Sequence, residues 1–192
     1  MSVFLVLIIG IVVVIIAGVI IYNSLVKLRI NADEAWSGIE VQLKRRYDLI
    51  PNLVETVKGY AKHERETLQE VLEARSKATS MNIDANNVTP EQMAEFAQVQ
   101  GALSGALGKL LAIAENYPEL KANENFLQLQ DELSNIESAI QAARRYYNGT
   151  VRDYNIKVET VPSNIIANMF NFKKREFFEI PEAEKAAPKV SF

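Results

Sequence analysis

The sequence of 192 residues contains no cysteine and a single histidine, His63. Without cysteine the chain has no disulfides, thiolate nucleophiles, iron–sulfur clusters, thiolate-bound zinc or cysteine-linked lipid. His63-Glu64 lacks the second histidine of a zinc-protease motif, because position 67 is threonine. Since no carboxylate lies beside a suitable acid, nucleophile or metal partner, the sequence predicts a protein that is not an enzyme and holds no metal or cofactor.

The chain also has little excess charge, with 21 Lys and Arg against 24 Asp and Glu and a net charge of −3 at pH 7. We therefore expect no nucleic-acid partner. The charge is unevenly spread, since residues 81–142 carry two basic and nine acidic side chains, whereas residues 143–192 carry nine basic and six acidic ones. The acidic middle is either a solvated surface or a partner for the basic ends of neighbouring copies in an assembly.

A long apolar run occupies the N-terminus. Val3 to Tyr22 contains no charged residue, and a helix of this length spans about 30 Å, the thickness of a bilayer's hydrocarbon core. A cleaved signal peptide is the alternative, but no basic residue precedes the run and no small-residue cleavage site follows it. The nearby Lys and Arg side chains all follow the run, which predicts a short outer N-terminus and a cytoplasmic body. We expect a single span that is retained in the membrane, with residues 24–192 on the cytoplasmic side.

Beyond the span, apolar residues recur at steps of three and four, the spacing of helices that pack along a seam. The first seam contains Trp36, Ile39, Leu43, Tyr47, Ile50, Val54, Val57, Ala61, Leu68 and Val71. Glu64 and Arg75 interrupt it, and Pro51 lies within it. Because the phase is the same on both sides of Pro51, the pattern favours one kinked helix from Ser24 to Thr79.

Two further helices follow a polar, turn-rich segment at 81–88. Thr89-Pro90-Glu91-Gln92 supplies the N-cap, the first-turn proline and the N3 glutamine of a helix start. The second seam contains Met93, Phe96, Gln100, Leu103, Leu107, Leu110, Ala114 and Tyr117. The third contains Phe126, Leu129, Leu133, Ile136, Ile140, Ala143, Tyr147, Val151, Tyr154 and Val158. After Pro162 the pattern predicts only a short helix over 164–169.

The predicted fold class is therefore all-α. An N-terminal transmembrane helix is followed by a long antiparallel helical bundle of three main helices plus a short C-terminal helix. The predicted divisions are a membrane anchor over 1–23, a cytoplasmic bundle over 24–162, and a short helix with an extended tail over 163–192.

Three glycines, Gly101, Gly105 and Gly108, lie inside the second predicted helix. Each costs about 1 kcal/mol of helix stability relative to alanine. We expect the close approach of another helix to offset this cost. That helix belongs either to the same chain or to a second copy.

The segment after the short helix combines aromatic rings with cations. It contains Phe170, Phe172, Lys173, Lys174, Arg175, Phe177 and Phe178. This composition is typical of an interfacial membrane contact. The alternative is that the phenylalanines dock onto the bundle while the cations stay in solvent.

Two stretches, RRYDLIPNLVETVKGYAKHE at 45–64 and NGTVRDYNIKVETVP at 148–162, resemble LemA family membrane proteins. Residues 114–122 and the tail over 170–192 fit the same family, so the resemblance covers nearly the whole chain. It implies a one-pass bacterial membrane protein with a cytoplasmic bundle of long antiparallel helices. One branch of the family is associated with building magnetosome membranes. The resemblance implies no enzymatic activity and carries over no catalytic or ligand residues.

The motif positions of this resemblance are polar or helix-bending residues. They are Arg45, Asp48, Pro51, Asn52, Asn148, Arg152, Asp153 and Asn155. We interpret them as buried or interface groups that fix the register between the first and third helices.

The sequence thus favours a non-enzymatic, membrane-anchored helical scaffold that forms homo-oligomers and organises or shapes the bacterial membrane. The alternative is a membrane-tethered adaptor that docks a partner membrane protein, such as a protease or transporter, through an exposed groove. An exposed apolar patch would favour the adaptor, and complementary self-surfaces would favour the scaffold. Both roles make the lipid bilayer a partner.

Overall fold

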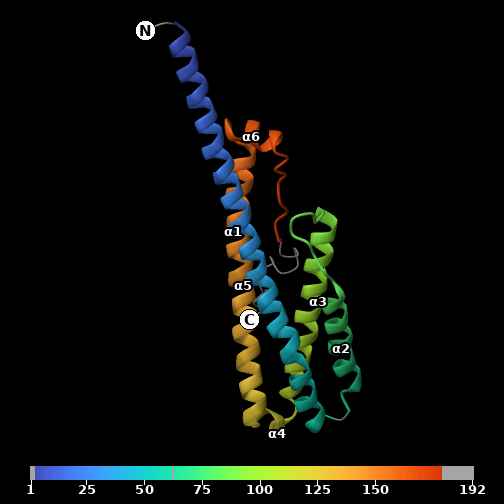
Figure 1. Cartoon of the computed structure of the whole chain (residues 1–192). Coiled ribbons are helices and arrows are strands. Elements are labelled where there is room, and N and C mark those ends of the chain that lie inside the picture. Colours follow the sequence, from blue (N-terminus) through green and yellow to red (C-terminus); the bar gives the residue numbers. More distant parts are fainter. Residues whose placement is uncertain (1–2, 62, 179–192) are drawn as a thin grey trace, which may run out of the picture.

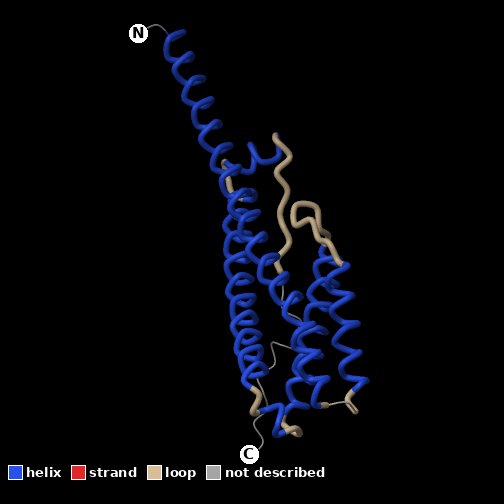
Figure 2. The backbone as a smooth tube through the Cα atoms, turned by 60° about the horizontal axis from the view of Figure 1, so that its bottom comes forward, coloured by secondary structure: helices blue, strands red, loops and turns tan. Residues whose placement is uncertain are grey.

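The computed structural model describes residues 3–61 and 63–178. Nearly all of this part is helical, and the described residues contain no strand. The predicted all-α class is confirmed. The molecule is an elongated bundle from which the N-terminal part of one helix projects at one end (Figures 1 and 2).

The described residues form six helices. These are α1 (Val3–Tyr60), α2 (Arg65–Ser80), α3 (Pro90–Ala114), α4 (Pro118–Lys121), α5 (Glu124–Glu159) and α6 (Ser163–Met169). The four long helices alternate in direction, and α1 packs mainly along α5 while α2 packs along α3 (Figure 1). The short α4 lies at the end of the bundle where α1 finishes, called the distal end below, and α6 lies near the other end.

Helix α1 contains the apolar run and continues into the bundle. Its N-terminal part is long and apolar enough to cross a membrane by length and composition, and its side chains are exposed. The predicted division between residues 23 and 24 falls inside α1, which passes it without a break. The apolar run and the first bundle helix are therefore one helix.

The prediction that the first bundle helix reaches Thr79 is wrong, because α1 ends at Tyr60 and α2 runs back along the bundle. A straight helix would have extended beyond the distal end of the bundle. Folding back buries Leu68 and Val71, which such an extension would have left exposed. The bundle therefore has four long helices instead of three. Glu64 was the signal for this turn, since a carboxylate in a seam position is costly to bury.

Pro51 lies inside α1, and its missing N–H leaves the Tyr47 carbonyl without the usual helical donor. The Arg75 side chain of α2 supplies a replacement, because its Nε donates to the Tyr47 oxygen at 2.8 Å. The interruption of the seam at Arg75 thus has a physical reason. The proline in one helix and the arginine in the next form a matched pair.

We expect Arg75→Met to lower the free energy of unfolding by about 1 to 2 kcal/mol in the native background, where it leaves the Tyr47 carbonyl without its donor. The loss should shrink in a Pro51→Ala background, since the substituted alanine provides an N–H for the same oxygen. A double-mutant cycle measured by denaturant unfolding tests this coupling. Equal losses in both backgrounds would contradict it.

The predicted start of α3 is confirmed in detail. The Gln92 N–H donates to the Thr89 hydroxyl at 3.3 Å, and the Thr89 N–H donates to the Gln92 side-chain oxygen at 2.9 Å. Most residues of the three predicted seams are buried and form one continuous core. A second, smaller cluster around Leu25 and Tyr154 lies where α6 meets α1 and α5.

Candidate functional site

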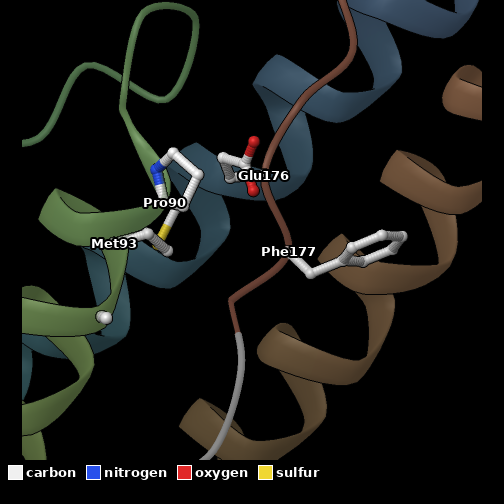
Figure 3. A pocket seen from close by; sticks show the side chains of 5 residues that line it. Pro90, Met93, Glu176 and Phe177 are labelled. Carbon is white, nitrogen blue, oxygen red and sulfur yellow. The ribbon is translucent and has the colours of Figure 1, made fainter.

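The most elaborate contact in the molecule is made by the chain after α6. Residues 172–178, called the C-terminal strap below, are extended and run back along α5 in the opposite direction. Figure 3 shows the strap passing between α3 and α5, with Glu176 directed toward Pro90 and Met93 and with Phe177 directed toward α5. A small pocket beside the strap is lined by Pro90, Met93, Ala94, Glu176 and Phe177.

Two asparagines of α5 hold the strap by its backbone. The Asn155 amide donates to the Arg175 carbonyl and accepts from the Arg175 N–H, both at 2.9 Å. Asn148 makes the same reciprocal pair with Phe178, at 3.0 and 2.9 Å. Each side-chain amide therefore makes the two backbone hydrogen bonds that a neighbouring strand would make with an extended segment.

The tyrosine before each asparagine adds a third bond. The Tyr154 hydroxyl donates to the Lys173 carbonyl at 2.9 Å, and the Tyr147 hydroxyl donates to the Glu176 carbonyl at 3.0 Å. The two Tyr-Asn pairs are seven residues apart on α5, or about 10.5 Å. Their partners are three residues apart on the strap, or about 10 Å of extended chain. This match of helix and strand lengths sets the register of the strap.

Asn148 and Asn155 were predicted to register the first helix against the third, and the structure corrects this, since both bind the strap. The signal in the sequence was the repeated Tyr-Asn dipeptide at heptad spacing. Arg152 and Asp153 lie on the exposed side of α5 and pair with each other at 3.2 Å, so neither fixes a helix register.

The strap ends in an aromatic cluster that joins three helices. The Phe178 ring is fully buried, with its centroid 5.4 Å from Phe96 of α3 and 6.0 Å from Trp36 of α1. The Arg144 guanidinium of α5 lies 4.3 Å from the same centroid. Phe178 therefore contacts α1, α3 and α5 at once, and its position couples the strap to the bundle core.

Arg175 is buried, unlike the two lysines before it. Its guanidinium pairs with Asp33 of α1 at 2.5 Å and donates to the Asn86 side chain in the loop after α2. The expectation that the cations stay in solvent is wrong for this arginine. Lys173 and Lys174 are exposed, and Lys174 pairs with Glu159 at 2.8 Å.

The four phenylalanines divide between the two predicted environments. Phe172 and Phe178 are buried against the bundle, whereas Phe170 and Phe177 are exposed. Phe172 lies in the smaller cluster near α6 and Phe178 in the main core. The strap thus docks Phe172 and Phe178 and leaves Phe177 outside, and Phe170, which precedes the strap, is exposed as well.

Burial raises the pKa of Tyr147 to about 12, from an ordinary value of 10.0. Above pH 10 the unfolded chain loses this proton while the folded chain keeps it. We expect the free energy of unfolding to fall as the pH rises from about 10 to 12, by about 2 to 3 kcal/mol from this residue. Denaturant unfolding of the wild type and Tyr147→Phe across this range tests the contribution. An equally steep alkaline loss in the variant would contradict it.

A buried polar network crosses the bundle nearer the distal end. Arg46 of α1 is fully buried and donates to Ser104 of α3 and Glu137 of α5, each at 3.0 Å. It also donates to the side chain of Gln100, whose amide donates to the Tyr47 hydroxyl at 2.7 Å. Sequence reasoning missed Arg46, and only the polar Gln100 in the second seam indicated that the core is not wholly apolar.

The motif residues of α1 lie mostly on its exposed face, which corrects their interpretation as register-fixing groups. Arg45 donates to Gln42, Asp48 pairs with Lys44 at 2.8 Å, and Asn52 is exposed. Arg45, Asp48 and Asn52 recur, with two further exposed residues of α1, at steps of three and four residues. The five residues therefore form one exposed stripe along the helix. This α1 stripe consists of Gly38, Val41, Arg45, Asp48 and Asn52.

Gly105 and Gly108 do not mediate a close helix crossing among the helices that the structure describes. A Cβ added at either position meets no atom of the described residues within 4 Å, and both glycines are exposed. Gly101 is half-buried. Nearby, the buried Ala106 is the small side chain on the inner face of α3.

We expect Gly105→Ala to raise the free energy of unfolding by about 1 kcal/mol, because it adds helix propensity in open space. Thermal or denaturant unfolding of the variant measures this directly. A destabilised variant would mean that the close crossing exists after all.

An exposed groove lies between α1 and α2 near the distal end. Val54, Leu68 and Leu72 supply its apolar side chains. Its polar lining consists of Glu55, Lys58, His63, Arg65 and Gln69. Within residues 3–61 and 63–178, no cluster of His, Cys, Asp and Glu side chains is arranged to hold a metal ion.

Comparison with known proteins assigns this chain to a protein family. The LemA family profile matches residues 35–192. Protein LemA of Metamycoplasma hominis is 29% identical over 164 residues, which cover 85% of this chain and 71% of the relative. Magnetosome protein MamQ 2 of Paramagnetospirillum magneticum is 25% identical over 179 residues, covering 82% of this chain and 64% of the relative. The chain thus spans less than two thirds of the magnetosome relative, and it belongs to the LemA family.

Proposed function

We propose that this protein is a non-enzymatic, membrane-anchored scaffold that self-associates and organises or shapes the bacterial membrane. The observation that carries the proposal is the unbroken course of α1 from the apolar run to the distal end. A continuous helix of 58 residues is about 87 Å long. Because no loop separates the span from the bundle, the two are joined rigidly, and neighbouring copies can meet through the same faces at the same height above the bilayer, which a regular assembly requires.

Two exposed features support self-association. The α1 stripe places Arg45, Asp48 and Asn52 on the exposed face of α1, where Arg45 and Asp48 bond to side chains of their own helix. Gly105 and Gly108 each lower helix stability relative to alanine, although a Cβ at either position would meet no atom of the described residues. The close approach of a second copy would explain why glycine stands there. The match to relatives named magnetosome proteins adds support for a role at a membrane.

The proposed orientation places the N-terminus outside and the bundle in the cytoplasm of the inner membrane. Lys27 and Arg29 follow the apolar run closely and are exposed on α1. Basic flanks of this kind remain on the cytoplasmic side.

Light scattering and negative-stain imaging of the full-length protein in native nanodiscs test the proposal. We expect large, regular particles that are lost when residues 1–23 are deleted. Asp48→Arg, in the α1 stripe, should reduce the particle size without lowering the melting temperature. Glu73→Arg is the matched control, because it reverses the charge of an exposed carboxylate on α2. A uniform monomer in the wild type would reject self-association.

The second candidate is an adaptor that docks a partner membrane protein. The groove between α1 and α2 favours it, since Leu72 stays exposed beside a polar rim far from the membrane end. Native nanodiscs would then contain one copy and a second protein at fixed stoichiometry. Leu72→Asp should abolish that pairing, and an unchanged composition would count against the adaptor.

A further inference from the structure

The helix α6 buries two small side chains and exposes two large apolar ones. Ser163 and Ala167 face the bundle and are 3% and 0% exposed. Ile165 and Met169, on the opposite side of the helix, are 59% and 69% exposed. A helix that faces water on its outer side has the reverse arrangement. The outer face of α6 is therefore suited to an apolar environment.

The apolar surface continues at both ends of α6. Val161 precedes the helix and is 77% exposed, and Phe170 follows it and is 54% exposed. These two residues with Ile165 and Met169 form the α6 patch. Four large apolar side chains within ten residues are more than the isolated exposed residues of an ordinary surface.

The α6 patch lies beside the end of the apolar run. The Ile166 side chain lies 3.7 Å from a Cβ added at Gly18, so α6 touches α1 within the charge-free stretch. The ring centroids of Tyr22 and Phe170 are 4.7 Å apart. Gly18 and Tyr22 belong to the last turns of the run, where a span leaves the hydrocarbon core and where tyrosines concentrate.

Cationic side chains lie just beyond Tyr22, on the side toward the bundle. Lys27 and Arg29 are exposed on α1, and Lys173 and Lys174 are exposed at the start of the strap. The Arg29 guanidinium lies 5.2 Å from the centroid of the Phe172 ring. From the span toward the bundle, apolar side chains, aromatic rings and cations follow one another, in the order of hydrocarbon, interface and anionic headgroups in a bilayer.

We propose that α6 is an interfacial helix whose patch inserts into the bundle-side leaflet of the membrane that α1 spans. The bundle then has two membrane contacts, the span and the patch. Two contacts fix the tilt and the rotation of the bundle about the α1 axis, whereas a single span leaves both free. This inference rests on the membrane span of the proposed function and is independent of self-association.

Site-directed spin labelling tests the insertion directly, since the chain has no native cysteine to remove. Ile165→Cys and Met169→Cys carry a nitroxide in the full-length protein, with one copy in each nanodisc of phosphatidylcholine and phosphatidylglycerol. Val41→Cys is the control, because Val41 is an apolar residue of similar exposure, 56%, within the bundle. Collision rates with oxygen, which enters lipid, and with a water-soluble nickel chelate are measured at each position.

We expect the chelate collision rates at 165 and 169 to be about tenfold lower than at 41, as for side chains removed from water. The oxygen collision rates should be higher than at 41. Equal chelate access at all three positions would overturn the proposal. Shielding that appears only when several copies share a disc would also overturn it, because a second copy would then cover the patch. Shielding in single-copy discs upholds the proposal even where the protein fails to self-associate.

Discussion

Phe178→Ala is expected to lower the free energy of unfolding by about 3 to 5 kcal/mol, the range for a large aromatic ring removed from a core. The ring is fully buried between Trp36 and Phe96 and under the Arg144 guanidinium. Its loss leaves a cavity where α1, α3 and α5 meet. Denaturant unfolding of the full-length protein measures the change.

The same substitution should release the strap from α5. Amide hydrogen exchange at positions 175 and 178, whose backbone N–H groups bond to Asn155 and Asn148 in the wild type, should accelerate well beyond the global effect. Phe177→Ala is the matched control, because the neighbouring ring is 38% exposed and should cost less than about 1 kcal/mol. Similar losses for the two variants would contradict the assignment of Phe178 as the anchor of the strap.

Arg46→Ala has the second large expected effect, a loss of about 3 kcal/mol in the free energy of unfolding. This is the lower end of the range for a broken buried ion pair, because the Glu137 partner is partly exposed and can be rehydrated. The substitution also leaves Gln100, which is fully buried, without one of its partners.

Arg45→Ala is the control for Arg46→Ala. The two arginines are neighbours in sequence, but Arg45 is exposed and bonded only to Gln42 on its own helix among the described residues. Its loss should change the free energy of unfolding by less than about 0.5 kcal/mol. Equal effects of the two substitutions would mean that the buried network does not stabilise the bundle.

The helices themselves could be predicted from the sequence, because seam spacing and capping are local signals. The Thr89 capping box and the seam residues of α3 and α5 lie where the pattern indicated. The end of α1 could not be predicted in the same way. Whether the seam after Ala61 continues straight or folds back depends on where the bundle ends, which is a property of the whole fold.

The sequence indicated only one side of the contact between the strap and α5. Tyr147-Asn148 and Tyr154-Asn155 repeat at heptad spacing, but their partners are backbone groups of an extended segment, and backbone groups have no sequence pattern. Arg75 likewise looked like a fault in a seam until its bond to the carbonyl freed by Pro51 was visible. Interactions between distant segments were the ones that local periodicity could not predict.

The central claim is that the membrane span and the bundle form one rigid body. Nitroxides at Gly10→Cys and Val41→Cys, which are both exposed on α1 and lie on either side of the junction between span and bundle, test it by pulsed electron–electron distance measurement in nanodiscs. One continuous helix predicts a single narrow distribution at about 46 Å, from about 1.5 Å of rise per residue. A broad distribution, or a maximum shorter by more than about one helical turn of 5.4 Å, would reveal a hinge in α1 and contradict the account.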